Sequence, residues 1–391
     1  MRALAFVITL LSIHLLATGS AHAAGLGKTY NEIVAFGESS TDTGNVAQAQ
    51  CSNAPPYLPG AGFPLFWAPC TPLDPSTGLP AYFDGRLTNG PMWVEFLADA
   101  LGVERPRPSA NYGTNYAHAG AKTGPDATTV PGAEEVNLRV NLYPNNPVLV
   151  PTDECPQPAY QAGEPVCGSE VPHINTQIAQ YLGDRGGFTH KQLVLIWGGA
   201  NDLRDAGLDP EGPELAIANV VRNLATAVGT AAAAGAKDIV VLNQLNAARA
   251  PITRALCGGD PTCLAQIEAA VRGFNAALST ALKELQSALD QQGYPTRVHY
   301  VDVFSAAEVA VELSEQFGMP FTNTTDAALI PDPTNPPFAN PIPGGAEDYL
   351  FWDVIHPTGK AYRIIAYQVC KTLDRQIPGF KPRCDEIVID N

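Results

Sequence analysis

The chain has 391 residues, of which 45% are hydrophobic, and it carries a formal net charge of −16 at pH 7. This length and apolar content allow one large domain with a substantial core. The strong negative charge argues against nucleic acid as a partner and against electrostatic docking on anionic lipid.

The amino terminus has the pattern of a targeting segment. Met1-Arg2 precedes a mostly apolar run from Ala3 to Ala17, and Ala21-His22-Ala23 supplies small residues for cleavage. A basic end, an apolar run of about 7–15 residues and a small-x-small site are typical of a secretory signal peptide. We therefore expect residues 1–23 to be removed. Residues 24–391 would then form a single secreted or periplasmic domain without a transmembrane segment.

Short apolar runs alternate with helical patterns along the rest of the chain. The runs have the length of strands, which predicts buried strands at Ile33–Phe36, Leu193–Trp197, Asp238–Leu242 and Val298–Val303. Helices are predicted at Pro91–Leu101, Pro213–Ala234 and Pro261–Leu289, and a glycine follows each of the first two. This alternation implies an α/β fold, with a parallel sheet between helices and ligand sites beyond the carboxyl ends of its strands.

Three long stretches fit neither pattern. Residues 51–80 and 125–172 are rich in Pro, Gly and Asn, and each contains two cysteines, whereas residues 318–347 are similar but contain none. Loops of this length in a compact domain are often lids or binding loops, and passive surface decoration is an equal alternative. We therefore expect loop insertions at these places within one domain, because no linker divides the chain.

The eight cysteines fall into couples that are close in sequence. Their even number suits an oxidising compartment, although the sequence alone does not fix the pairing. Local pairing is our preferred prediction, and it would join Cys51 to Cys70, Cys155 to Cys167, Cys257 to Cys263, and Cys370 to Cys384. A zinc site is the alternative, but the cysteines lack C-x-x-C or clustered Cys/His spacing. We accordingly expect no metal and no cofactor.

A set of polar residues could carry out ester hydrolysis by a serine, which requires a base, an orienting carboxylate and donors for the developing oxyanion. Asp353 and His356 are three residues apart, so the carboxylate could orient the imidazole. Ser39 and Asn201 each follow a predicted strand, and they offer a hydroxyl and a side-chain amide. Gly120 offers a backbone N–H. The fold would have to bring these residues together.

The same residues lie in blocks that resemble the motifs of the GDSL, or SGNH, hydrolase family. Phe36-Gly-Glu-Ser-Ser-Thr-Asp-Thr-Gly-Asn45 is similar to its first motif, F-G-D-S-L-S-D-T-G-N. The second block, the G-x-N-D block and the D-x-x-H block are matched in turn by Asn115–Ala121, Gly199–Asp202 and Asp353–His356. Arg86–Leu97 resembles a stretch of the larger, plant-lipase-like branch, R-x-S-N-G-P-x-W-x-x-x-L. The blocks follow the family order from residue 33 to residue 360.

The resemblance implies a three-layer α/β/α sandwich with a central, mainly parallel sheet of the flavodoxin-like kind. It implies Ser39 as the nucleophile, His356 as the general base and then acid, and Asp353 as its orienter. The oxyanion hole would consist of the Ser39 N–H, the Gly120 N–H and the Asn201 side chain. The implied activity is hydrolysis of a small-molecule or lipid ester through an acyl-enzyme, without a cofactor.

Two positions depart from the first motif, because Glu38 replaces the family Asp and Ser40 replaces Leu. The longer carboxylate could shift the hydrogen bonds that shape the nucleophile turn. The glycine spacing favours Ser39 over Ser40 as the nucleophile. Two other functions stay open: an acyltransferase that moves the acyl group to an alcohol, and a binding protein that keeps the fold with an impaired site. Neither the acyl length, nor the alcohol group, nor the oligomeric state has a signal in the sequence.

Overall fold

The computed structural model describes residues 29–45, 82–124, 171–206, 213–331, 339–341 and 346–387. The expected signal peptide and the expected loop at 51–80 lie outside the described residues, as does the loop at 125–172 except for its last two residues. The cysteine couples 51–70 and 155–167 also lie outside them, so their pairing stays a prediction.

Within the described residues, four parallel strands form the centre of the fold. They are hydrogen-bonded in the order β1 (Glu32–Gly37), β2 (Gln192–Trp197), β3 (Asp238–Leu242) and β4 (Arg297–Val301). A segment around Asn115 runs parallel to β1, where Asn115 forms a bridge with Ala35 and the Ala35 N–H donates to the Thr114 carbonyl at 3.0 Å. If this segment is counted as the second strand, the order is 2-1-3-4-5, that of flavodoxin-like folds.

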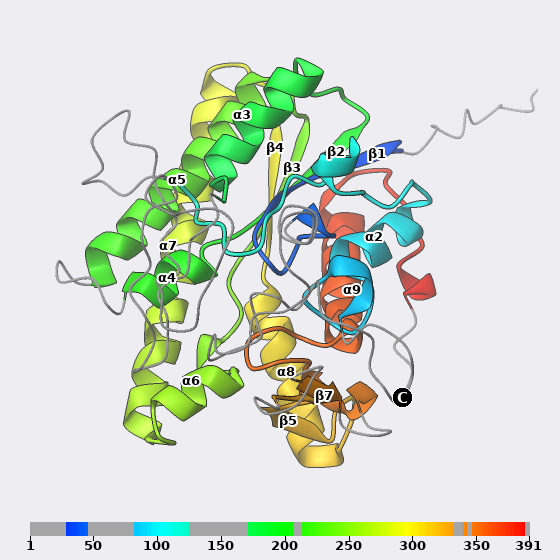
Figure 1. Ribbon diagram of the computed structural model, residues 1–391. Helices are drawn as coiled ribbons and strands as arrows, with labels where there is room; N and C mark the ends of the chain where they lie inside the picture. Colours follow the sequence, from blue (N-terminus) through cyan, green and yellow to red (C-terminus); the bar gives the residue numbers. More distant parts are fainter. Residues whose placement is uncertain are drawn as a thin grey trace, which may run out of the picture.

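Helices cover both faces of the sheet and give the expected three-layer α/β/α sandwich. Figure 1 shows α2 (Trp93–Leu101) and α9 (Gly359–Gln376) on one face, and α3 (Ile174–Arg185), α5 (Pro213–Ala233) and α7 (Pro261–Gln291) on the other. Because side chains alternate along a strand, Ile33 and Ala35 pack in the core with α2 and α9, whereas Val34 and Phe36 pack with α3, α5 and α7. Burial on both faces requires the continuous apolar runs from which the strands were predicted.

One predicted strand ends earlier in the structure than expected. A helix that was not predicted begins directly after it. The strand expected at Val298–Val303 ends at Val301, and Val303 is the first residue of α8 (Val303–Phe317). Asp302 caps this helix, because its side chain accepts the N–H of Ser305 at 3.0 Å. The boundary was misplaced because the apolar run of the strand continues into the first turn of α8.

Smaller elements lie beyond the carboxyl ends of the strands. The helices α4 (Ala200–Ala206) and α6 (Pro251–Leu256) follow β2 and β3. Short strands pair as β5 (Asn323–Ala327) with β8 (Tyr349–Phe351), and as β6 (Leu329–Pro331) with β7 (Ala339–Pro341). Single 3-10 turns are η3 (Phe83–Gly85), η4 (Ser109–Asn111), η6 (Ala247–Arg249), η7 (Ala346–Asp348) and η8 (Cys384–Glu386). The described part of residues 318–347, expected to be a loop, thus contains three short strands.

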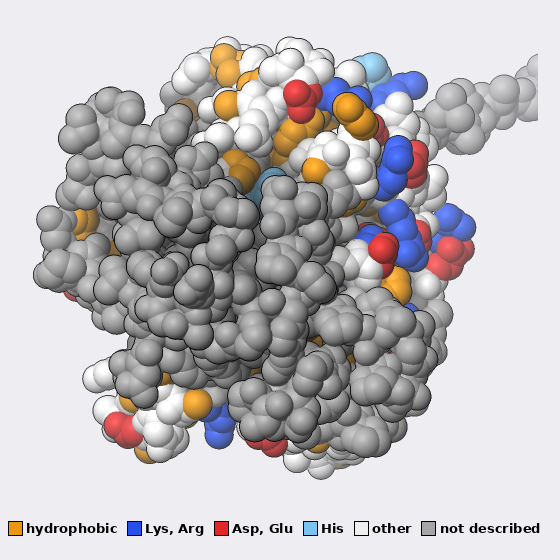
Figure 2. Space-filling view, viewed as in Figure 1, with side chains coloured by type: hydrophobic (Ala, Val, Ile, Leu, Met, Phe, Trp, Pro, Cys, Tyr) orange, Lys and Arg blue, Asp and Glu red, His pale blue; other side chains and the backbone are white. Residues whose placement is uncertain are grey.

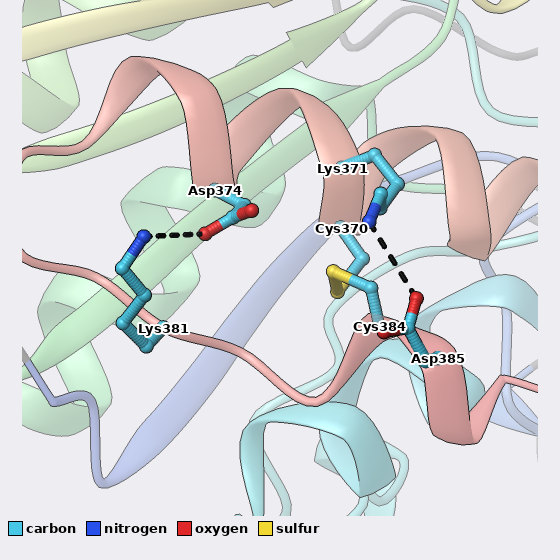
Figure 3. Close-up of a disulfide and its surroundings, with 6 residues drawn as sticks. All are labelled: Cys370, Lys371, Asp374, Lys381, Cys384 and Asp385. Carbon is cyan, nitrogen blue, oxygen red and sulfur yellow. Dashed lines mark ion pairs between the residues drawn. A yellow bond between two sulfur atoms is a disulfide. The ribbon is translucent and has the colours of Figure 1, made fainter.

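Two of the predicted disulfides are present. Cys370–Cys384 ties the carboxyl-terminal segment to α9, and Figure 3 shows ion pairs beside it between Lys381 and Asp374 at 3.6 Å and between Lys371 and Asp385 at 3.5 Å. Cys257–Cys263 joins the end of α6 to the start of α7. The prediction of local pairing is confirmed for these two couples.

The surface carries charges of both signs in close proximity. Figure 2 shows them intermixed along the edge that holds α2, where Arg105 pairs with Asp99 at 2.6 Å and Arg383 pairs with Glu386 at 2.9 Å. One helix of the described chain, Glu214–Ala233 within α5, is long and apolar enough to cross a bilayer. Its apolar residues pack in the core with α3 and α7, and this role accounts for its composition.

Candidate active site

A turn at residues 38–42, called the nucleophile turn after the role expected of Ser39, follows β1 at the carboxyl edge of the sheet. Gly37 is required there, because a Cβ at this position would lie 2.4 Å from the Trp197 carbonyl oxygen. The chain then turns sharply, with the N–H groups of Thr41 and Asp42 donating to the Glu38 carbonyl at 2.8 and 3.0 Å. This geometry places Ser39 at the end of the strand, as the sequence predicted.

Gln177 of α3 fixes the same turn from the side. Its Oε1 accepts the Gly37 N–H and its Nε2 donates to the Gly37 carbonyl, both at 2.9 Å. The side chain is fully buried, so these two bonds satisfy groups that have no access to water. No sequence pattern pointed to this glutamine, since it lies 140 residues from Gly37.

Asp353 and His356 form the pair that their spacing suggested. The His356 Nδ1 lies 2.8 Å from the Asp353 Oδ2, and both side chains are buried. The Asp353 Oδ1 accepts the backbone N–H groups of Ile355 and His356 at 2.8 and 2.7 Å, which fixes the carboxylate. With Nδ1 donating to the carboxylate, Nε2 is left as the acceptor, the form that a general base needs.

Tyr82 is a further partner of the pair. Its hydroxyl donates to the Asp353 Oδ2 at 3.1 Å. Burial raises the pKa of Tyr82 well above its usual range, and the Asp353 carboxylate adds to the effect, so the phenol stays a neutral donor. Tyr82 lies 271 residues from Asp353, and no sequence pattern joined the two residues.

The block at Arg86–Leu97 supports the loop between β8 and α9 that contains His356, here called the histidine loop. The Thr88 hydroxyl donates to the Pro357 carbonyl at 2.8 Å, and the Asn89 side chain accepts the Gly359 N–H at 2.8 Å. Arg86 itself makes a buried, two-pronged ion pair with Glu95, at 2.8 and 3.0 Å. The block recognised by resemblance therefore holds the backbone on the carboxyl side of His356.

Asn201 lines the same pocket as Ser39, but both of its amide N–H groups are already used. The Nδ2 donates to the Glu38 Oε2 at 2.6 Å and to the Ala121 carbonyl at 2.9 Å. On its other side, the Asn201 Oδ1 accepts from Arg204 at 3.0 Å. The amide is thus held between the nucleophile turn and the second sequence block.

Glu38, the main departure from the family motif, ties the turn after β1 to the start of α4. Besides Asn201 Nδ2, its carboxyl group accepts the N–H groups of Ala200 and Asn201, at 3.2 and 3.3 Å, at the start of α4. Burial raises the pKa of Glu38 to about 8, with the neighbouring Asp202 adding to the rise and the N–H donors opposing it. The longer side chain therefore reaches across to Asn201.

The second block lies against both the nucleophile turn and α4. The Ala119 N–H donates to the Asp42 Oδ2 at 2.9 Å, and Gly120 has a φ of 85°, which favours glycine. Asp202 accepts from the Thr123 hydroxyl at 2.8 Å, and burial raises the pKa of Asp202 to about 6. These contacts fix the segment that contains Gly120.

A pocket of about 200 Å³ borders the site, although Asp353 and His356 themselves do not line it. Ser39, Ser40 and Asn201 line it, as do Ile355 and Pro357, the neighbours of His356. Gly120 does not line this pocket, although the adjacent Ala121 bonds Asn201. Among the described residues, no cluster of three or more His, Cys, Asp or Glu side chains is placed to hold a metal ion.

The fold is a flavodoxin-like α/β sandwich. Its candidate site, a serine turn and an Asp–His pair, lies in loops at the carboxyl ends of the strands, as in other α/β proteins of this class. The sequence profile of the GDSL-like lipase/acylhydrolase family matches residues 33–369, and the chain belongs to this family. Membership supports a hydrolase of the esterase or lipase kind.

Individual relatives are distant. A GDSL esterase/lipase of Arabidopsis thaliana is 24% identical, over 86% of this chain and 78% of the relative. The GDSL esterase/lipase EXL2 of the same plant is 23% identical over 87% of each chain. A crystal structure of a lipolytic G-D-S-L family protein from Veillonella parvula shares 13% identity, with a TM-score of 0.36 over 88% of this chain and 98% of that one.

Proposed function

We propose that this chain is a secreted or periplasmic serine esterase or lipase that hydrolyses carboxylic esters through an acyl-enzyme. The observation that carries the proposal is the 2.8 Å contact between Asp353 and His356, in a loop that borders the pocket lined by Ser39. Family membership supports it. The two disulfides suit an oxidising compartment, to which a signal peptide at residues 1–23 would direct the protein.

In the proposed reaction, the Ser39 Oγ attacks the ester carbonyl while the His356 Nε2 takes its proton. The Asp353 carboxylate orients the ring and stabilises the imidazolium that forms. His356 then protonates the leaving alcohol. In the second half, a water molecule gives a proton to His356 and attacks the acyl carbon. The bond from that carbon to the Ser39 Oγ then breaks, and His356 returns the proton to Oγ as the acid is released.

The proposed oxyanion donors are the Ser39 N–H, the Gly120 N–H and the Asn201 amide. Because Asn201 has two N–H groups and already two acceptors, it must release one of them to bind the oxyanion. Glu38 is the acceptor that protonation weakens, since a neutral acid accepts a hydrogen bond less strongly than a carboxylate does. The rise in the pKa of Glu38 therefore favours the release.

The test is to replace Ser39. Ser39→Ala should lower the turnover of a chromogenic short-chain ester by something on the order of 10⁶-fold, because the catalytic residues act as a unit. Ser40→Ala is the matched control, since it removes the adjacent hydroxyl and leaves the proposed nucleophile. Equal turnover by Ser39→Ala and the wild type would show that the mechanism is wrong, and loss of activity only in Ser40→Ala would move the nucleophile by one residue.

A binding protein with an impaired site is the second candidate, and the 2.6 Å hydrogen bond between Asn201 and Glu38 favours it. If that bond never opens, one oxyanion donor is lost. Labelling with a fluorophosphonate separates the two functions. An activated Ser39 should be labelled in the wild-type protein and not in Ser39→Ala, whereas an inert site would leave both unlabelled.

A further inference from the structure

The pocket beside Ser39 extends away from the catalytic groups into a region whose lining is mostly apolar. We propose that it is an acyl-binding pocket, and that the preferred substrates are esters of acids with an extended aliphatic chain, rather than acetyl esters. The inference rests on the proposed function, because the occupant is the acyl group that Ser39 would carry.

One wall of the pocket is a single face of α8. The residues of this face, spaced at i, i+3, i+4, i+7 and i+8, are Val303, Ala306, Ala307, Ala310 and Val311. A helix face that packs on a core normally carries larger side chains, which fill the space. Three alanines leave that space open while keeping the surface apolar, so the face suits an aliphatic guest.

A second wall is continuous with the histidine loop. Ala361, Ile364 and Ile365 of α9 line the pocket, and this helix begins three residues after His356. Ile355 and Ile364 stay partly exposed although they are apolar, as expected for side chains that face a cavity. The apolar surface therefore reaches the point where an ester carbonyl would meet Ser39 and His356.

Several polar side chains of the lining are bound within the protein. The Trp197 Nε1 donates to the Asn243 carbonyl at 2.9 Å, and the Gln244 Nε2 donates to the Gly198 carbonyl at 2.7 Å. Arg249 is paired with Glu308 at 3.1 Å and with Glu315 at 3.0 Å. A sugar would need donors and acceptors for its hydroxyl groups, whereas these polar side chains are already paired within the protein. The mostly apolar lining offers an aliphatic chain a better match.

The acyl group, rather than the alcohol, is assigned to the pocket because it stays attached to Ser39 through both halves of the reaction. Its contacts can then act in both transition states, whereas the alcohol leaves after the first. Burial of each additional methylene should raise kcat/KM roughly fourfold until the chain fills the pocket.

The experiment compares two series of esters with the wild-type protein. In the first, p-nitrophenyl esters run from acetate to dodecanoate. In the second, acetate esters carry alcohols of increasing length. We expect kcat/KM to rise with acyl length and to change little with alcohol length. A flat acyl series would overturn the proposal, and a response confined to the alcohol series would assign the pocket to the alcohol.

Ala306→Leu provides a second, independent test, because it fills part of the pocket. It should lower the ratio of the octanoate to the acetate kcat/KM about 16-fold, the equivalent of two methylene sites at roughly fourfold each. Val309→Leu is the matched control on the same helix. Val309 is 55% exposed and does not line the pocket, so the ratio should stay at its wild-type value. An unchanged ratio in folded Ala306→Leu, or an equal fall in both variants, would contradict the assignment.

These outcomes separate the inference from the proposed function. If acetate is hydrolysed in a Ser39-dependent way but chain length has no effect, the esterase proposal stands and the acyl pocket is wrong. If Ser39→Ala hydrolyses every ester as fast as the wild type, the proposed mechanism is wrong, and with it the identity of the occupant.

Discussion

At the residue scale, the Asp353–His356 pair depends on one carboxylate with several donors. Asp353 binds His356 through Oδ2 and accepts two backbone N–H groups through Oδ1, so the carboxylate and the ring are held in one orientation. An amide at this position would present an N–H to Nδ1 and favour the wrong tautomer.

Asp353→Asn should therefore lower kcat about 10⁴-fold while the protein stays folded. Tyr82→Phe serves as the comparison, because it removes the hydroxyl that donates to the same oxygen and leaves the carboxylate in place. We expect its effect on kcat to be far smaller. Steady-state kinetics on one ester measure both. If the two variants lose activity equally, the carboxylate is not the group that orients His356.

Glu38 should give the protein a recognisable pH dependence. Its pKa is raised to about 8 in the fold from an ordinary value near 4.5, so the native state holds this proton over a range in which the unfolded state has lost it. More protons bound to the native state means that stability falls as the pH rises through that window. The slope from this one group is at most about 1.4 kcal/mol per pH unit.

Glu38→Gln removes that titration. The free energy of unfolding of the variant, measured by urea denaturation relative to the wild type, should therefore increase steadily between about pH 5 and pH 8. Glu284→Gln, at an exposed position on α7, is the matched control and should show a constant difference. Parallel curves for Glu38→Gln and the wild type would mean that Glu38 titrates alike in both states.

Residues near one another in the sequence were predictable, and distant pairs were not. The spacing of Asp353 and His356 gave their contact, and the departure at Glu38 marked an unusual position. Its bond to Asn201 crosses 163 residues, and the bond of Tyr82 to Asp353 crosses 271. Such contacts depend on how the strands line up, which no local pattern encodes.

At the element scale, the apolar runs predicted the strands because these are buried on both faces. The helix α9 was not predicted, although its buried residues, among them Tyr362, Ile365 and Val369, follow helical spacing and its lysines, arginines and glutamines lie off that stripe. The helix has two structural roles. It begins directly after the histidine loop, and near its end it carries Cys370, which forms a disulfide.

The Cys370–Cys384 disulfide should contribute to the stability of this helix and the segment that packs on it. It closes a loop with a sequence separation of 14 residues. Loss of a bridge over a loop of this size is expected to cost about 3 kcal/mol, mainly by freeing the unfolded chain. Replacing both cysteines with alanine should lower the free energy of unfolding by this amount in urea denaturation.

The matched comparison is the double alanine variant at Cys257 and Cys263. Their sequence separation is 6, and Cys257 and Cys263 lie on the partly exposed face between α6 and α7 rather than in the core. The smaller loop should give a smaller loss. If the second variant is destabilised more than the first, loop closure is not the main contribution of these bridges.

At the scale of the whole molecule, the carboxyl ends of the strands bring together blocks from residue 39 to residue 356. The order of these blocks along the chain pointed to the site, and the parallel sheet explains why they meet. The pocket wall formed by α8 and α9 was not predicted. A cavity forms where small side chains leave space unfilled, and this depends on what packs opposite them in the fold. Alanine spacing in a sequence does not distinguish a pocket from a tightly packed helix.

The net charge of −16 also acts on the molecule as a whole. A negative field should raise the local concentration of cationic substrates and lower that of anionic ones, to the extent that salt does not screen it. The screening length falls from about 30 Å at 0.01 M salt to about 10 Å at 0.1 M. The kcat/KM of an ester with a cationic alcohol should therefore fall several-fold over this range, and that of an anionic analogue should rise.

A neutral ester of the same acyl chain is the internal control, and its kcat/KM should change little. The comparison also tests the pocket, because Arg249 lies in its lining but is paired with Glu308 and Glu315. If the site instead behaved as a local positive charge, the anionic ester would react faster at low salt and slow down as salt is added. This salt dependence would show that the arginines, rather than the net charge of the chain, determine the electrostatic potential at Ser39.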